Sequence, residues 1–406
     1  MRLLLFTGKG GVGKTTVATS TAVHAARAGV KTLVVSTDAA HSLGDALGLT
    51  LPVDEVHEVE AGLWARQVDT GARLARSWGG VQAYLASLLT ALDVEPLDAA
   101  ELTALPGADD VLALLALRDH AAAATWDLVV VDCAPTAETL RLLALPEALT
   151  RLVERLQPAQ RVLARSFAPL AVRATGLPMP SQGVASGLAR LRQELAEVLD
   201  VLHGPEASVR LVLTPESVVL AEARRTLTAL CLNGLVVDGA VVNRVLPDDG
   251  GSAWVRQRAE AQAVVLEQVA ADLIGLDVRT APFLPAEPVG ADALAELGRV
   301  LAGDDVDALL APPRRLPPVR VERVEPSHRD GVAGDALELV LELPLTRASD
   351  VALARRGDDL HVAVGDSRRV VSLPSALRRC SVASARMRDG ALHVRFVPDP
   401  AQWPQR

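Results

Sequence analysis

The chain has 406 residues, of which 50% are hydrophobic and only 2% aromatic, so it can hold two or more domains with cores built from Ala, Leu and Val. Its net charge of −9 argues against generic binding of nucleic acid, which needs a basic footprint. It has no apolar run of about 18 residues and no room for a signal peptide before its first motif, so we expect no stable membrane insertion. Three isolated cysteines without CxxC spacing indicate buried thiols in a reducing cytoplasm: Cys133, Cys231 and Cys380.

The first motif is a glycine-rich loop between a predicted strand and a predicted helix. Arg2 to Phe6 is a short apolar run, and Thr16 to Arg27 has helical spacing. The segment between them, GKGGVGKTT, has the spacing of a phosphate-binding P-loop. A glycine-rich turn without a ligand is the alternative, which the flanking elements disfavour. The predicted nucleotide contacts in the loop are Gly8, Lys9, Gly10, Gly11, Val12, Gly13, Lys14, Thr15 and Thr16.

Two of the few lysines in the chain lie in this loop. Of 41 Lys and Arg residues only Lys9, Lys14 and Lys31 are lysines. A compact ammonium fits a tight phosphate cradle better than the planar fork of Arg. We expect Lys14 to reach the β- and γ-phosphates of ATP and the Thr15 hydroxyl to bind Mg²⁺. Lys9 is expected to be a second phosphate-facing charge that acts across a dimer.

Two carboxylates follow predicted buried strands. Asp38 comes just after the strand 31–36, and Asp132 ends the apolar run of DLVVVD. Open α/β sheets place their ligand chemistry at the carboxyl ends of the strands. Asp38 could therefore orient the attacking water or bind a metal-bound water, and a helix N-cap is its other possible role. Asp132 has the position of a Walker-B carboxylate beside Mg²⁺.

The remaining pattern predicts a doubly wound α/β domain followed by a small β-domain. Residues 58–125 and 147–203 indicate a helical subdomain, and strands at 208–213, 235–245 and 278–281 alternate with helices at 216–232 and 253–274. These elements predict a mainly parallel sheet over residues 1–311. A proline-rich segment, 312–326, is expected to be a linker. Short strand-like runs over 327–400 predict an antiparallel β-sandwich, at 336–343, 360–364, 368–373 and 391–397.

Several motifs, in order, resemble the ArsA family of arsenite-pump ATPases, which includes the ATPase of guided entry of tail-anchored proteins. They are GKGGVGKTT, STDAAHSLGDALG, VVVDCAPTAETLRLLALP, LTPESVVLAEARRTL and VVNRVLP. The resemblance covers most of residues 1–300. The C-terminal part is similar to the α-crystallin-type domain of small heat-shock proteins, in DDLHVAVGDSRRVVSLP and ARMRDGALHVRF.

The resemblance implies a dimeric, Mg²⁺-dependent ATPase that opens and closes with its nucleotide. It implies that Lys9 reaches the nucleotide of the partner subunit, that Asp38 orients the hydrolytic water and that Asp132 supports Mg²⁺. It further implies that Asn243 contacts adenine and that Phe283 lies in the adenine-side loop.

The chain also departs from the family pattern. Ala39 replaces the usual proline after the switch aspartate, and Ala137–Glu138 replaces a Gly-His pair, so hydrolysis is expected to be tuned differently. A dimer must hold without the zinc-binding CxxC. The chain has a single P-loop and lacks the arsenite-binding cysteine set.

Two function classes follow from the resemblance. The first is a cytoplasmic, homodimeric chaperone or targeting ATPase that binds hydrophobic, membrane-protein-like client segments in a nucleotide-dependent way. The second is the motor ATPase of an arsenite-type anion efflux system. The heat-shock-like domain favours the first class. A positioning ATPase of the ParA or MinD type shares the P-loop, but the DAAHSL segment fits it poorly.

Overall fold

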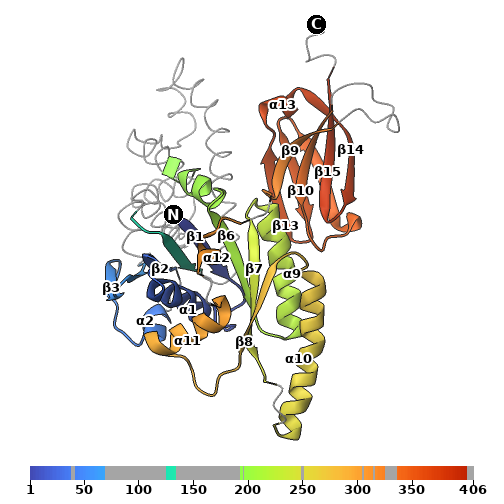
Figure 1. Ribbon diagram of the computed structural model, residues 1–406. Coiled ribbons are helices and arrows are strands. Elements are labelled where there is room, and N and C mark those ends of the chain that lie inside the picture. The colour runs from blue at the N-terminus through green and yellow to red at the C-terminus, as the bar shows by residue number, and fades with distance from the viewer. Residues whose placement is uncertain are drawn as a thin grey trace, which may run out of the picture. The chain divides into compact units, whose positions relative to one another are not determined.

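The computed structural model in Figure 1 describes residues 1–37, 42–68, 125–133, 193–194, 196–247, 251–303, 306–313, 316–324 and 336–399. These residues form two compact units. The first holds the described residues of Met1–Leu3, Ala18–Gly204 and Pro288–Leu310, and the second holds those of Leu4–Val17, Pro205–Glu287 and Ala311–Arg406. No helix of the described part is long and apolar enough to cross a membrane.

An eight-stranded, mostly parallel sheet is the framework of the α/β part of the chain. Its strand order is β3-β4-β2-β5-β1-β6-β7-β8. The strands are β1 (Arg2–Thr7), β2 (Thr32–Ser36), β3 (Val56–Glu60), β4 (Leu63–Gln67), β5 (Leu128–Asp132), β6 (Ala207–Leu213), β7 (Val237–Val245) and β8 (Asp277–Pro282). The strands β1, β2 and β5 are buried along their whole length, which explains their continuous apolar sequence.

In the first unit, the part of helix α1 (Lys14–Arg27) from Ala18 onward packs against α11 (Ala291–Ala302). This unit also holds the short helices α2 (Ser42–Leu47) and α12 (Asp307–Leu310). A Cβ atom at Gly298 of α11 would lie 2.3 Å from the carbonyl oxygen of Ser20, so the two backbones approach closely there. Arg27 at the end of α1 forms ion pairs with Glu60 and Asp292.

In the second unit, strands and helices alternate as the sequence predicts. Helix α9 (Ser217–Leu232) connects β6 to β7, and α10 (Ala253–Asp272) precedes β8. The pairs β6–β7 and β7–β8 are parallel. Helices α9 and α10 lie side by side (Figure 1), and Arg224 of α9 forms an ion pair with Asp272 of α10.

The helical prediction for 58–125 is wrong at its start. Strand β3 runs antiparallel to β4, which in turn pairs in parallel with β2, so this segment extends the sheet at one edge. The ring of Trp64 in β4 lies 5.0 Å from that of Trp126, and the Lys31 ammonium lies over both rings. Such cation–π contacts stabilise this edge. The rest of 58–125, and all of 147–203 except its last residues, fall outside the described residues; residues 196–202 are helical.

The C-terminal part is a two-sheet antiparallel sandwich, as predicted. One sheet has the order β14-β15-β10-β9 and the other β11-β12-β13. The strands are β9 (Val319–Val324), β10 (Ala336–Glu342), β11 (Val351–Arg356), β12 (Asp359–Val364), β13 (Ser367–Ser372), β14 (Cys380–Arg388) and β15 (Ala391–Pro398), with a 3₁₀ turn, η1 (Ala348–Asp350), and helix α13 (Ser375–Arg378). Alternate side chains of these strands form one buried core that includes Leu339, Leu341, Val394 and Phe396.

The segment 312–326, expected to be a linker, contains the edge strand β9. Its residues Val319 to Val324 pair antiparallel with β10, and Val319 packs against the sandwich core. Four of the five prolines of this segment precede the strand, which agrees with the rarity of proline inside a sheet. The sandwich therefore begins earlier than residue 327.

The sandwich shares its core with helix α9 of the same unit. Leu232, the last residue of α9, is fully buried in the sandwich core. The Thr228 hydroxyl donates a hydrogen bond of 2.7 Å to the carbonyl of Pro344, and Arg369 of β13 donates to the carbonyl of Leu232. The end of α9 is thus a structural part of the sandwich.

We expect Gly298→Ala to lower the free energy of unfolding. Gly→Ala inside a helix usually stabilises a protein by up to about 1 kcal/mol. Here the new methyl group meets the backbone of α1, and the overpacking should instead cost about 1–3 kcal/mol. Denaturant unfolding measures the change, with Val300→Ala, on the exposed side of α11, as a control that should stay within about 0.5 kcal/mol. A stabilised Gly298→Ala variant would contradict this helix crossing.

Candidate functional site

The glycine loop lies between the buried strand β1 and helix α1, as its sequence predicts. The loop backbone passes so close to β6 that a Cβ atom at Gly8 would lie 2.1 Å from the carbonyl oxygen of Val212. Only glycine fits at that position. Gly11 and Gly13 adopt positive φ angles of 81° and 89°, which non-glycine residues rarely adopt. The loop therefore curls at the N-terminus of α1, which is the arrangement that binds anions.

Two residues at the end of β7 form hydrogen bonds with the loop backbone. The Asn243 amide is 7% exposed, and its nitrogen donates a hydrogen bond of 2.9 Å to the carbonyl of Val12. A Cβ atom at Gly13 would lie 2.3 Å from this same nitrogen. The Arg244 guanidinium donates a hydrogen bond of 3.0 Å to the carbonyl of Gly11. Two consecutive loop carbonyls are thus tied to two consecutive residues of β7.

The two loop lysines have different surroundings. Lys14 is buried, and its ammonium donates a hydrogen bond of 3.3 Å to the carbonyl of Lys9, so it lies under the curl of the loop. The side chain of Lys9 is 41% exposed and lies 3.7 Å from the Glu222 carboxylate on α9. Lys9 therefore extends away from the loop backbone, whereas Lys14 is held beneath it.

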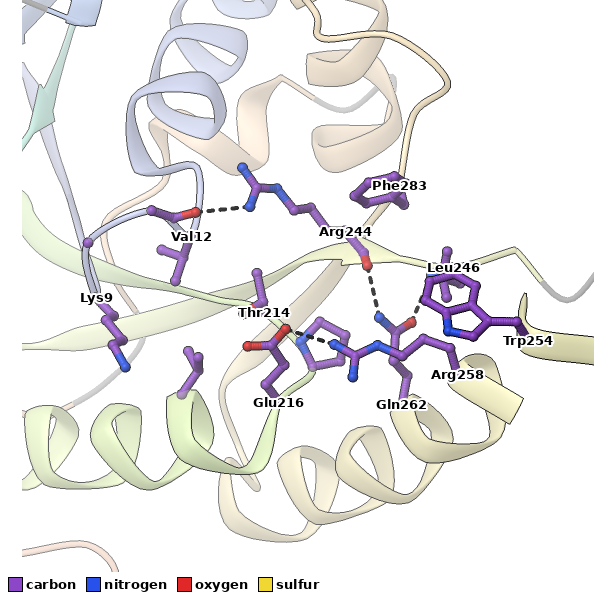
Figure 2. Close-up of a pocket in the computed structure, with 14 residues that line it drawn as sticks. Lys9, Val12, Thr214, Glu216, Arg244, Leu246, Trp254, Arg258, Gln262 and Phe283 are labelled. Atoms are coloured by element: carbon purple, nitrogen blue, oxygen red, sulfur yellow. Dashed lines mark hydrogen bonds and ion pairs between the residues drawn. The ribbon is translucent and has the colours of Figure 1, made fainter. Parts of the chain in front are cut away.

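A pocket of about 560 Å³ opens beside the loop (Figure 2). Lys9 and Val12 lie at one end of this pocket and Trp254 and Phe283 at the other. An ion pair of 2.9 Å joins Arg258 of α10 to Glu216, the N-cap residue of α9. The lining residues are Lys9, Gly10, Gly11, Val12, Thr214, Pro215, Glu216, Val219, Arg244, Leu246, Trp254, Arg258, Gln262 and Phe283.

The lining suits a ligand with a phosphate end and a planar, largely apolar end. Loop residues and the cations Lys9 and Arg244 line the loop end, and aromatic and aliphatic side chains lie at the other (Figure 2). Phe283 is 52% exposed, so its ring is accessible at the pocket. Of the two adenine contacts implied by the resemblance, Phe283 lines the pocket, while the Asn243 amide is engaged with the loop. The contact of Asn243 with adenine stays a prediction.

The second predicted carboxylate, Asp132, lies in the first unit at the end of β5. It is fully buried, and the Ser36 hydroxyl donates to it over 3.3 Å from the end of the neighbouring strand β2. The backbone N–H of Thr37 donates to the Asp132 carbonyl. A buried carboxylate with a hydroxyl beside it at the end of a parallel strand fits a hard cation such as Mg²⁺, which binds oxygen ligands.

Some predicted residues lie outside the described residues. Asp38 is one of them, and so are Ala39 and the pair Ala137–Glu138. The described part of the chain has no cluster of three or more His, Cys, Asp or Glu side chains that could hold a metal ion by themselves. A single carboxylate and a hydroxyl are enough for Mg²⁺ when phosphates and water complete its shell.

Sequence reasoning missed the polar residues that connect the pocket elements: Glu216, Arg244, Arg258 and Gln262. Gln262 was detectable, because it occupies the apolar stripe of α10 together with the buried Val265 and Val269. A buried amide in such a stripe needs hydrogen-bond partners. The ion pair of Glu216 with Arg258 joins residues 42 positions apart and leaves no local signal.

We expect Gly8→Ala to lower the melting temperature by several degrees, because its methyl group would collide with the Val212 carbonyl. Gly10→Ala is the matched control in the same loop, since no atom lies within 4 Å of its would-be Cβ. Its melting temperature should equal that of the parent chain. Differential scanning calorimetry measures both variants without added ligand. Equal melting temperatures for the two variants would contradict the packing of the loop on β6.

Comparisons with known proteins agree with this geometry. Residues 1–303 match the family model of anion-transporting (ArsA) ATPases, and residues 334–396 match the HSP20-like domain found in ArsA. The chain is 42% identical to an uncharacterized protein of Streptomyces coelicolor over 409 aligned residues, which cover 100% of both chains.

Two further relatives have functional names. A putative arsenical pump-driving ATPase of Chlorobaculum tepidum is 31% identical over 98% of this chain and 96% of its own. ATPase GET3B of Arabidopsis thaliana is 28% identical over 72% of this chain and 77% of its own. The family implies nucleotide binding and ATP hydrolysis. The chain belongs to the ArsA family of anion-transporting ATPases and ends in the HSP20-like domain of that family.

Proposed function

We propose that the chain is a homodimeric, Mg²⁺-dependent ATPase of the cytoplasm that binds hydrophobic, membrane-protein-like client segments under the control of ATP. The observation that carries the client part is the shared core of α9 and the HSP20-like sandwich, through Leu232. The same helix starts at the nucleotide pocket, where its N-cap residue Glu216 lines the wall. One helix therefore connects the nucleotide pocket to a domain of chaperone type.

The nucleotide chemistry is assigned to the phosphate loop, to Asp38 and Asp132, and to Phe283 and Asn243. The loop N–H groups and the Lys14 ammonium bind the phosphates, and Thr15 and Asp132 hold Mg²⁺. When bound, Mg²⁺ neutralises charge on the phosphates. Asp38 orients the attacking water. Phe283 and Asn243 serve the adenine end.

Lys9 is assigned to the nucleotide of the partner subunit. Its contact with Glu222 is a partly exposed ion pair with a separation of 3.7 Å, and such pairs contribute little free energy. The ammonium can therefore leave Glu222 at small cost and reach a phosphate that approaches from outside the subunit. The direction of its side chain, away from its own loop, supports this role.

The alternative function is the motor of an arsenite-type efflux system, which the names of relatives such as the Chlorobaculum tepidum protein favour. The As(III) centre of arsenite is a soft acceptor that binds best to several converging thiolates. All three cysteines of this chain are buried and lie on separate elements: Cys133 after β5, Cys231 in α9 and Cys380 in β14. This distribution favours the client-binding proposal over the motor.

The trans role of Lys9 predicts complementation between two inactive variants. Lys14→Ala should lose nucleotide binding, and Lys9→Ala should bind ATP but not turn it over, since a trans cation contributes about 10³ to 10⁵ in rate in other phosphoryl-transfer enzymes. A mixed dimer has one subunit that binds ATP without Lys9 and one that supplies Lys9 without binding. We expect ATPase activity to return when the two variants are mixed.

The control is a mixture of each variant with Lys9→Ala/Lys14→Ala double-mutant protein, which should stay inactive. Mixed dimers are verified with two different affinity tags. If tagged mixed dimers form and no activity returns, Lys9 serves its own subunit.

Client binding predicts that a labelled transmembrane peptide binds more tightly when ATP is present. Fluorescence anisotropy measures the affinity with ATP, with ADP and with the Lys14→Ala variant, in which ATP should have no effect. In parallel, arsenite is added to the ATPase assay. If the peptide affinity is the same with ATP and ADP, and arsenite stimulates the ATPase activity, the motor function is favoured instead.

A further inference from the structure

A buried glutamine on α10 connects this helix to the segment after the predicted adenine residue Asn243. Gln262 is 7% exposed, although the positions that follow it in the same stripe are valines. Its side-chain oxygen accepts a hydrogen bond of 2.8 Å from the backbone N–H of Leu246. Its side-chain nitrogen donates one of 3.2 Å to the carbonyl of Arg244. The oxygen and the nitrogen of the Gln262 amide therefore both form hydrogen bonds with the backbone between Arg244 and Leu246.

That piece of backbone has an unusual conformation. Arg244 has a φ angle of 61°, in the left-handed region that residues other than glycine rarely adopt. The Asn243 side-chain oxygen accepts a hydrogen bond of 2.9 Å from the Arg244 N–H. The Arg244 peptide is thus fixed on its N–H side by Asn243 and on its carbonyl side by Gln262. Surrounding contacts of this kind are what hold a residue in a sparsely populated conformation.

The fixed Arg244 backbone sets the direction of its side chain, which reaches the phosphate loop. Its guanidinium donates to the carbonyl of Gly11, next to the carbonyl of Val12 that Asn243 holds. In a trans peptide the C=O and the following N–H point in opposite directions, and the described residues contain no cis peptide. Tying the carbonyls of Gly11 and Val12 to β7 therefore turns the N–H groups of Val12 and Gly13 to the opposite side.

We propose that Gln262 is a positioning residue of the nucleotide site, which acts through Arg244 to keep the N–H groups of the phosphate loop turned toward the ligand. The proposal rests on the nucleotide binding assigned above to this loop. It adds a second support that comes from α10, a helix outside the P-loop motif. Figure 2 shows the line of contacts, from Gln262 to the Arg244 backbone and from the Arg244 side chain to the loop.

The test is a double-mutant cycle read in ATP affinity by isothermal titration calorimetry. Gln262→Met keeps the volume of the side chain and removes both hydrogen bonds, and should raise the Kd for ATP about tenfold. Arg244→Asn keeps a residue that tolerates the left-handed conformation and removes the guanidinium. It should weaken ATP binding by a similar factor. Since Gln262 acts through Arg244, the double variant should bind ATP about as weakly as either single variant.

Two further variants separate positioning from general stability. Gln262→Glu keeps the acceptor for the Leu246 N–H but loses the donor to the Arg244 carbonyl, so its Kd should also rise although the shape is unchanged. Gln268→Met is the matched control on the exposed side of α10 and should bind ATP like the parent chain. Melting temperatures are recorded for every variant, and the titrations use the folded fraction.

The outcomes distinguish this inference from the proposed function. If the parent chain itself does not bind ATP, the nucleotide assignment fails. If the parent binds ATP and Gln262→Glu binds equally well, Gln262 does not position the loop. If the effects of Gln262→Met and Arg244→Asn on the Kd multiply, Gln262 does not act through Arg244, and the inference is overturned.

Discussion

The close approach of backbone to backbone at the phosphate loop is the constraint on which the rest of the site depends. Gly8 leaves no space for a side chain beside the Val212 carbonyl, and Gly13 leaves none beside Asn243. The loop therefore lies against the neighbouring strands β6 and β7, and the segments that follow these two strands line the pocket. Thr214 to Glu216 follow β6, and Leu246 follows β7. The glycines thus place the pocket as well as shaping the loop.

The charged side chains of the loop and of the pocket wall differ in how firmly their contacts hold them. Lys14 is buried under the loop, while Lys9 is shared loosely with Glu222 on the surface of α9. The contacts in the pocket wall are shorter, at 2.9 Å for Arg258 with Glu216 and 3.0 Å for Arg244 with the Gly11 carbonyl. Glu216 is the N-cap residue of α9 and Glu222 lies on α9, so the ion pairs of Arg258 and of Lys9 both involve this helix or its cap.

The sequence predicted the features that depend on neighbouring residues. The strand before the loop, the loop itself, the alternation of strands and helices after residue 208 and the C-terminal sandwich all follow from local periodicity and glycine spacing. Sequence periodicity did not predict strand β3, whose side chains are exposed or partly buried. It also did not predict strand β9, because the prolines before it indicated a linker. The contacts of Gln262 with Arg244, and of Lys9 with Glu222, join distant segments, so only a folded structure reveals them.

Leu232 has a consequence for how the two modules coexist in one chain. It ends a helix of the ATPase part and yet fills the interior of the sandwich. If the sandwich were separated from the rest of the chain by a cut within the proline-rich segment, Leu232 of α9 would become exposed. The sandwich would lose a core residue, so neither fragment would retain its full stability. The HSP20-like module is therefore joined to α9 through a shared core and not only through a linker, so the unfolding of the module and of this helix is thermodynamically linked.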